Sequence, residues 1–186
     1  MSLASDVTGS RYGAAMLAWT RRSGFAAIVL ITAASACTGA AARSPAESVP
    51  AEGMHVPVTK VTDGDTIHVT FQGQDERIRL IGIDTPEVPW YGGQGDCFGV
   101  EAALFARRHL SGRSIRLGFD VDRRDRYGRL LAYVYLGDQL FNLTLVRLGY
   151  ARADPVPPDV RMAVELARAE AQARRAGRGL WSACPH

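Results

Sequence analysis

The chain has 186 residues, of which 47% are hydrophobic, and 22 Lys and Arg against 19 Asp and Glu give it a formal net charge of +3. This composition is that of an ordinary globular protein and excludes a disordered or fibrous chain. The three cysteines are too few for a disulfide-dense scaffold, and no apolar run reaches the roughly 20 residues of a spanning helix, which excludes a protein with several membrane spans.

The first 37 residues have the features of an export signal. Arg21-Arg22 precedes a short stretch of small and apolar residues that ends directly before Cys37, as is typical of a signal peptide. The position of Cys37 indicates a lipoprotein signal in which this cysteine is lipidated, whereas cleavage without lipidation would release the protein. Met16 is an alternative start to Met1. We therefore expect an exported protein, either a cell-envelope lipoprotein or a secreted one, with membrane contact only through Cys37.

Residues 38–53 differ in composition from the rest of the chain. They are rich in Ala, Ser, Pro and Gly and lack apolar periodicity, which predicts a flexible linker. A single domain over residues 54–186 follows.

The domain begins with three stretches that predict β-strands, because β-branched residues are frequent and polar and apolar residues alternate. They are residues 56–61, 66–71 and 77–81. The turns at 62–65 and 72–75 are rich in Asp and Gly, which favours hairpins. The sequence therefore predicts a meander of three antiparallel strands.

Two further strands and three helices are expected after the meander. The strands are 115–119 and 130–136, the second apolar enough to be buried on both faces, and the helices are 100–110, 143–148 and 159–176. Asn142 is interpreted as the N-cap of the middle helix and Gly149 as its end. Five short strands with three helices predict a mixed β and α fold, the five-stranded OB-fold β-barrel, in which closure removes sheet edges.

Carboxylates are concentrated in two turns. One is the hairpin tip Asp63-Gly64-Asp65, and the other is Asp84-Thr85-Pro86-Glu87, which follows the third strand. Each alone has a structural explanation, because Asp-Gly and Thr-Pro sequences favour turns. Adjacent strands can nevertheless bring both turns to one end of a barrel, where the carboxylates would repel one another unless a cation lay between them. Oxygen ligands suit a hard cation such as calcium or magnesium.

Arginines accompany the second of these turns. Arg79 precedes Asp84 by five residues in the third strand, and Arg126-Tyr127-Gly128-Arg129 leads into the fifth. Guanidinium groups beside a carboxylate-bound cation would bind an anion through its oxygens, with phosphate the obvious candidate. Arg123 and Arg124 are interpreted as solvated surface charges.

The order and spacing of residues 63–66, 79–87 and 125–133 resemble those of the staphylococcal nuclease (thermonuclease) family. The resemblance extends over nearly all of residues 56–182. It implies an OB barrel with three helices that hydrolyses DNA and RNA with calcium. No feature indicates an oligomer, and we expect a monomer.

The resemblance implies a calcium site, residue by residue. Asp65, Asp84 and the main-chain carbonyl of Thr85 would bind the ion, and Asp63 would lie in the outer shell.

The resemblance also implies how the phosphodiester bond would be cleaved. Glu87 would act as general base or orient the attacking water, Arg79 and Arg129 would clamp the phosphate oxygens, and Arg126 and Tyr127 are expected on the substrate side. Endonucleolytic cleavage of the bond to the 5′ oxygen would leave 3′-phosphate ends.

One segment departs from the family. Residues 154–157, Asp-Pro-Val-Pro, occupy the place of aromatic residues that stack on the nucleotide base, a contact worth about 1–3 kcal/mol per base. This departure affects the expected affinity and base preference.

The alternative function is a catalytically silent OB-fold module that binds nucleic acid or a protein, as the resemblance implies for some domains of the family. Such a module would be expected to lose the carboxylates or the arginines, which are all present here.

Cys97 and Cys184 remain after Cys37 is assigned to the signal. Cysteines in an exported protein more often pair than stay free, so a disulfide is favoured over two free thiols.

Overall fold

The computed structural model describes residues 53–89 and 94–185. The predicted signal peptide, its lipidation site Cys37 and all of the linker but Gly53 lie outside these residues. Within the described ranges, no helix combines the length and apolar composition needed to cross a bilayer.

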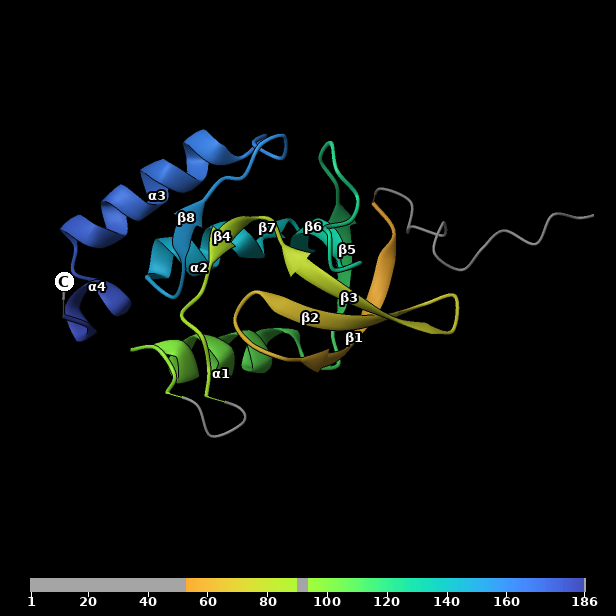
Figure 1. Ribbon diagram of the computed structural model, residues 1–186, viewed down its shortest axis with the longest axis horizontal. Coiled ribbons are helices and arrows are strands. Elements are labelled where there is room, and N and C mark those ends of the chain that lie inside the picture. The colour runs from red at the N-terminus through yellow and green to blue at the C-terminus, as the bar shows by residue number, and fades with distance from the viewer. Residues whose placement is uncertain (1–52, 90–93, 186) are drawn as a thin grey trace, which may run out of the picture. The chain divides into compact units, whose positions relative to one another are not determined.

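Five strands form a closed barrel (Figure 1). They are β1 (His55–Val61), β2 (Thr66–Phe71), β3 (Gln74–Leu80), β5 (Ser114–Gly118) and β6 (Leu130–Leu136). The first three form an antiparallel meander, β5 pairs antiparallel with β1 and β6, and β3 pairs parallel with β6 to close the sheet. The predicted OB-fold barrel is confirmed. The second hairpin turn is shorter than 72–75, because Gln74 and Asp75 already pair with β2.

The barrel core follows the polar and apolar alternation of its strands. In β2 and β3, Ile67, Val69, Ile78 and Leu80 are fully buried, and each such side chain contributes about 1.5–3 kcal/mol. The expectation that β6 is buried on both faces is only partly correct, since Leu131 and the last two residues of the strand are half-buried.

The three predicted helices are present, and among the described residues a one-turn helix follows them. They are α1 (Gly99–Leu110), α2 (Phe141–Leu148), α3 (Ala163–Arg175) and α4 (Leu180–Ala183). The prediction that the third helix starts at residue 159 is wrong. The buried Asp159 carboxylate instead accepts a hydrogen bond from Asp122 N at 2.9 Å. This contact holds the segment around Asp159 in a turn.

Asn142 is not an N-cap, because it lies inside α2 and its side chain points toward the barrel. Its Oδ1 accepts a hydrogen bond from Val134 N at 2.9 Å, and its Nδ2 donates one to Ile81 O at 2.9 Å. Gly149 ends the helix as predicted, with a φ of 78° that few other residues adopt.

Three short strands were not expected from the sequence. They are β4 (Gly82–Asp84), β7 (Gln139–Leu140) and β8 (Arg152–Asp154). Antiparallel pairing of β4 with β8 places Asp84 opposite Arg152. In Figure 1 this pair lies between the barrel strands and α3, so Asp84 belongs to a small ribbon beside the barrel and not to β3.

Candidate active site

The two carboxylate-bearing turns lie against each other. The Oδ2 atom of Asp65 accepts hydrogen bonds from Thr85 N at 2.8 Å and from Thr85 Oγ1 at 2.9 Å. Gly64 permits this approach, because a Cβ at that position would lie 2.6 Å from the Thr85 Cγ2 atom. Residues 20 positions apart in sequence thus form one unit at the end of the β1–β2 hairpin.

Arg79 lies between two of the carboxylates. Its Nη1 atom is 3.2 Å from Asp65 Oδ2, and its Nη2 atom is 3.2 Å from Asp84 Oδ1. The same guanidinium donates hydrogen bonds to the carbonyl oxygens of Leu80 and Ile83, each at 2.8 Å. These carbonyls flank the junction between β3 and β4, so the backbone fixes the orientation of the arginine.

The carboxylates affect one another electrostatically. Burial, followed by the charge of Asp65, raises the pKa of Asp63 to about 6. The same two causes, in the same order, raise the pKa of Asp84 and of Glu87, although the Arg79 charge opposes the rise in both. Asp65 is therefore the common neighbour of three carboxyl groups. Asp63 also shapes the turn, because its Oδ1 atom accepts hydrogen bonds from Asp65 N at 3.0 Å and Thr66 N at 2.6 Å.

The ligand chemistry of this cluster suits a hard cation. Asp65 and Asp84 share Arg79 as a partner, and with the Thr85 carbonyl they offer oxygen ligands only. A positive ion would relieve the repulsion that raises the carboxyl pKa values. In residues 53–89 and 94–185, no three His, Cys, Asp or Glu side chains are grouped to hold a metal.

Arg129 is oriented by Asp125 in the turn before β6. Asp125 Oδ2 accepts a hydrogen bond from Arg129 Nε at 2.7 Å, and its Oδ1 accepts bonds from Arg129 N and Tyr127 N, both at 2.9 Å. Burial alone would raise the pKa of Asp125, but these hydrogen bonds and the Arg129 charge outweigh it and lower the pKa.

The interpretation of Arg124 as a solvated charge is wrong. Its Nη1 and Nη2 atoms bind Glu76 Oε2 and Oε1 at 3.0 and 3.1 Å, and Nη1 also donates to Gly128 O at 2.9 Å. These contacts of the Arg124 guanidinium group with Glu76 hold the 124–129 turn against β3. Arg123 stacks over the Phe119 ring at 4.3 Å, which also differs from a free surface charge.

Arg126 and Tyr127 project at the surface. The Tyr127 side chain is 61% exposed, and its hydroxyl accepts a hydrogen bond from Arg126 Nη2 at 2.6 Å. The Arg129 guanidinium lies 5.6 Å from the centre of the Tyr127 ring. The three side chains therefore form one cationic and aromatic group.

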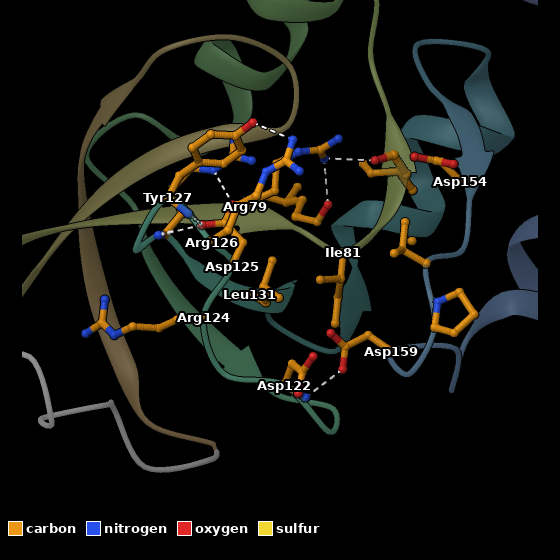
Figure 2. Close-up of a pocket in the computed structure, with 16 residues that line it drawn as sticks. Arg79, Ile81, Asp122, Arg124, Asp125, Arg126, Tyr127, Leu131, Asp154 and Asp159 are labelled. Carbon is orange, nitrogen blue, oxygen red and sulfur yellow. Dashed lines mark hydrogen bonds and ion pairs between the residues drawn. The ribbon is translucent and has the colours of Figure 1, made fainter.

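A pocket of about 470 Å³ extends from the arginines toward the segment before α3. Arg79, Arg126 and Tyr127 lie toward one side of it in Figure 2, and the hydrogen-bonded Asp122 and Asp159 lie toward the other. Leu131 and Ile81 lie between them. Val156 and Pro157, from the segment that departs from the family pattern, also line the pocket.

Glu87, the last residue of the second carboxylate turn, does not line this pocket. Its main chain is bonded to Asp96, whose side chain accepts from Glu87 N at 3.1 Å and whose N–H donates to Glu87 O at 2.9 Å. Asp96 precedes Cys97, which forms the predicted disulfide with Cys184.

Three residues of this region were missed by sequence reasoning. Asp125 had a local signal, since Asp at the first position and Gly at the fourth position of 125–128 favour a turn held by the Asp side chain. Asp96 and Arg124 had none, because their partners Glu87 and Glu76 come from other parts of the chain.

A closed five-stranded barrel that brings clustered carboxylates and oriented arginines together has the architecture of an OB-fold phosphodiesterase. A family model described as "Staphylococcal nuclease homologue" matches residues 77–183. The thermonuclease of Staphylococcus intermedius is 41% identical over 124 residues, which cover 67% of this chain and 74% of that protein. The thermonuclease of Staphylococcus hyicus is 40% identical over 125 residues, with 67% and 74% covered.

A more distant relative is endonuclease YncB of Bacillus subtilis (strain 168), which is 32% identical over 131 residues that cover 69% of this chain and 62% of that protein. The chain belongs to the staphylococcal nuclease family. It is a nuclease, and therefore a phosphodiesterase with nucleic acid as its substrate.

Proposed function

We propose that this protein is an exported, calcium-dependent nuclease that hydrolyses both DNA and RNA, cutting internally and leaving 3′-phosphate ends. The observation that carries the proposal is the joining of the two carboxylate turns by Asp65 and Thr85, with Arg79 between Asp65 and Asp84. This arrangement supports a site in which a cation and a phosphate are neighbours.

Asp65, Asp84 and the Thr85 carbonyl would hold the calcium ion, and Asp63 would act from the outer shell. When bound, the ion supplies positive charge against the phosphate oxygens and lowers the pKa of a coordinated water. Asp63 and Thr85 also fix the Asp65 turn by hydrogen bonds, so the ligands are held in place by the protein itself.

The remaining roles fall to Glu87 and two arginines. Glu87 would accept a proton from the attacking water, which is the role of a positioned carboxylate in general-base catalysis. Arg79 and Arg129 would donate hydrogen bonds to the phosphate oxygens as negative charge builds at phosphorus. Both guanidinium groups are oriented by other contacts, which reduces the reorganisation needed during the reaction.

Arg126 and Tyr127 would bind the substrate beside the phosphate group that Arg79 and Arg129 hold. Both line the pocket together with Leu131, Val156 and Pro157. Aliphatic and proline side chains in place of stacking aromatics favour weak base preference, since base-specific stacking energy is lost.

The decisive experiment compares the purified protein with Glu87→Gln on single-stranded DNA and RNA, in calcium and in chelator. We expect cleavage that needs calcium and a loss in kcat of about 10²–10⁴-fold for the variant, the range of general-base catalysis. Mass spectrometry of the products should find 3′-phosphate ends.

Glu165→Gln, which makes the same chemical change at an exposed position in α3, is the matched control and should retain activity. Folded protein that binds nucleic acid but cleaves neither substrate with any divalent ion would instead support the silent binding module.

Export and anchoring are supported by the sequence of residues 1–37. Expressed with its signal in a bacterial host, the protein should fractionate with membranes and be released by Cys37→Ser. Release of the unchanged protein would indicate cleavage without a lipid, and retention in the cytoplasm would contradict export.

A further inference from the structure

Glu87 is held through its backbone by a residue nine positions later in the chain. The Asp96 carboxylate accepts a hydrogen bond from Glu87 N at 3.1 Å, and Asp96 N donates to Glu87 O at 2.9 Å. Both polar groups of the Glu87 main chain are therefore bonded to one residue, so Asp96 restrains Glu87 in position and in orientation.

The two residues that follow Asp96 are fixed to other parts of the chain, and the third packs against Glu87. Cys97 is bridged to Cys184, and the Phe98 ring stacks on Tyr150 with 5.5 Å between centroids. Gly99 packs so closely that an added Cβ would lie 2.2 Å from Glu87 O. A support fixed in this way can hold another residue, whereas a mobile loop could not.

We propose that Asp96 is a positioning residue for Glu87 in the hydrolytic step. The inference rests on the proposed role of Glu87 as the proton acceptor. Asp96 acts through the main chain and touches no reacting atom. Its two hydrogen bonds hold the Glu87 backbone and thereby set the position of the Glu87 carboxylate relative to the attacking water. A shift of about 1 Å in a catalytic group can lower the rate on the order of 10²-fold.

Three substitutions separate the hydrogen bond from the charge. Asp96→Ala removes the acceptor, Asp96→Glu keeps the charge but moves the acceptor by one methylene, and Asp96→Asn keeps an acceptor oxygen and removes the charge. We expect kcat to fall about 10- to 100-fold for the first two, with KM changed by less than about twofold. Asp96→Asn should stay within about threefold of the unchanged protein. Asp138→Ala, at an exposed position in the β6–β7 turn, is the control.

A double-mutant cycle with Glu87→Gln gives a readout that a purely structural role would not move. If Asp96 acts through Glu87, adding Asp96→Ala to Glu87→Gln should change the residual kcat by less than about twofold. Equal fractional losses in both backgrounds, or full activity of Asp96→Ala and Asp96→Glu, would overturn the proposal.

The cycle also distinguishes a failure of the proposed role of Glu87 from a failure of the positioning role of Asp96. Full activity of Glu87→Gln would contradict the proposed role of Glu87, whereas a strong loss there with an unchanged Asp96→Ala would contradict only the positioning role. Thermal melting of each variant shows that it is folded. Should Asp96→Ala fail to fold, the comparison of Asp96→Glu with Asp96→Asn decides, because both keep a polar side chain of similar size.

Discussion

Single residues in this site act through the partners that orient them. Arg129 shows this most directly, because Asp125 binds both its backbone and its guanidinium. An arginine whose side chain is already held loses little conformational freedom on binding a phosphate. The carboxylate of Asp125 therefore supports both the fold of the turn and the orientation of the Arg129 guanidinium.

The lowered pKa of Asp125 makes its contribution to stability dependent on pH. Because the folded pKa lies below the unfolded value of about 3.9, the stabilisation is fully present above that value and is lost as pH falls through the folded pKa. Asp125→Asn should lower the free energy of unfolding by about 1–3 kcal/mol at pH 7. Urea unfolding from pH 7 to pH 3 should show the difference from the unchanged protein shrinking below pH 4.

The matched control for this measurement is Asp138→Asn, which has an exposed carboxylate and should show no such convergence. A constant difference at all pH values would mean that Asp125 acts by packing alone.

The proximity of Asp65, Arg79 and Asp84 could be predicted at the residue scale, because each residue lies in a short, recognisable pattern. Asp65 follows a hairpin Gly, and Arg79 and Asp84 are five residues apart around a single chain bend. The supporting residues could not be predicted in this way. Arg124 binds Glu76 across 48 positions, and no local pattern distinguishes it from Arg123, which makes no such ion pair with Glu76.

At the scale of elements, one buried amide connects three segments. Asn142 in α2 bonds to Val134 in β6 and to Ile81 at the end of β3. The sequence pattern placed it at a helix end, since Asn is common there. Only the packing of α2 against the barrel gives the amide two backbone partners, and this packing cannot be predicted from the eight residues of the helix alone.

Replacing Asn142 should therefore lower the free energy of unfolding by more than the loss of a helix N-cap would. Asn142→Ala would leave the Val134 N–H and the Ile81 carbonyl without this partner, at about 1–3 kcal/mol for each buried group. Chemical denaturation should find a loss of about 2–5 kcal/mol. Thr144→Ala is the control within the same helix, because that side chain bonds only to Leu140 O at 3.2 Å, and it should cost less than about 1.5 kcal/mol. Equal losses for both variants would contradict the bridging role.

The whole domain is also held by a covalent link between distant parts of the chain. The Cys97–Cys184 bridge joins residues 87 positions apart, and a loop of that length restricts the unfolded chain by about 4.6 kcal/mol. The replacement Cys97→Ser with Cys184→Ser should lower the free energy of unfolding by roughly that amount.

A reducing agent provides the internal control. It should lower the melting temperature of the unchanged protein toward that of the double variant and leave the variant itself unaffected. A double variant as stable as the oxidised protein would show that the bridge adds nothing to the rest of the fold.

The parallel pairing of β3 with β6 has a kinetic consequence. It aligns Arg79 with Leu131, so the strand contact that closes the barrel also sets Arg79 beside the segment carrying Arg129. If Arg79 and Arg129 bind the phosphate together as proposed, a folding intermediate with the β1–β2–β3 meander formed but this contact open would lack activity. During refolding from urea, nuclease activity should accordingly return together with the structural phase that pairs β3 with β6, because this pairing between distant segments costs loop entropy to form. The rate at which nuclease activity returns would then report the rate at which the barrel closes.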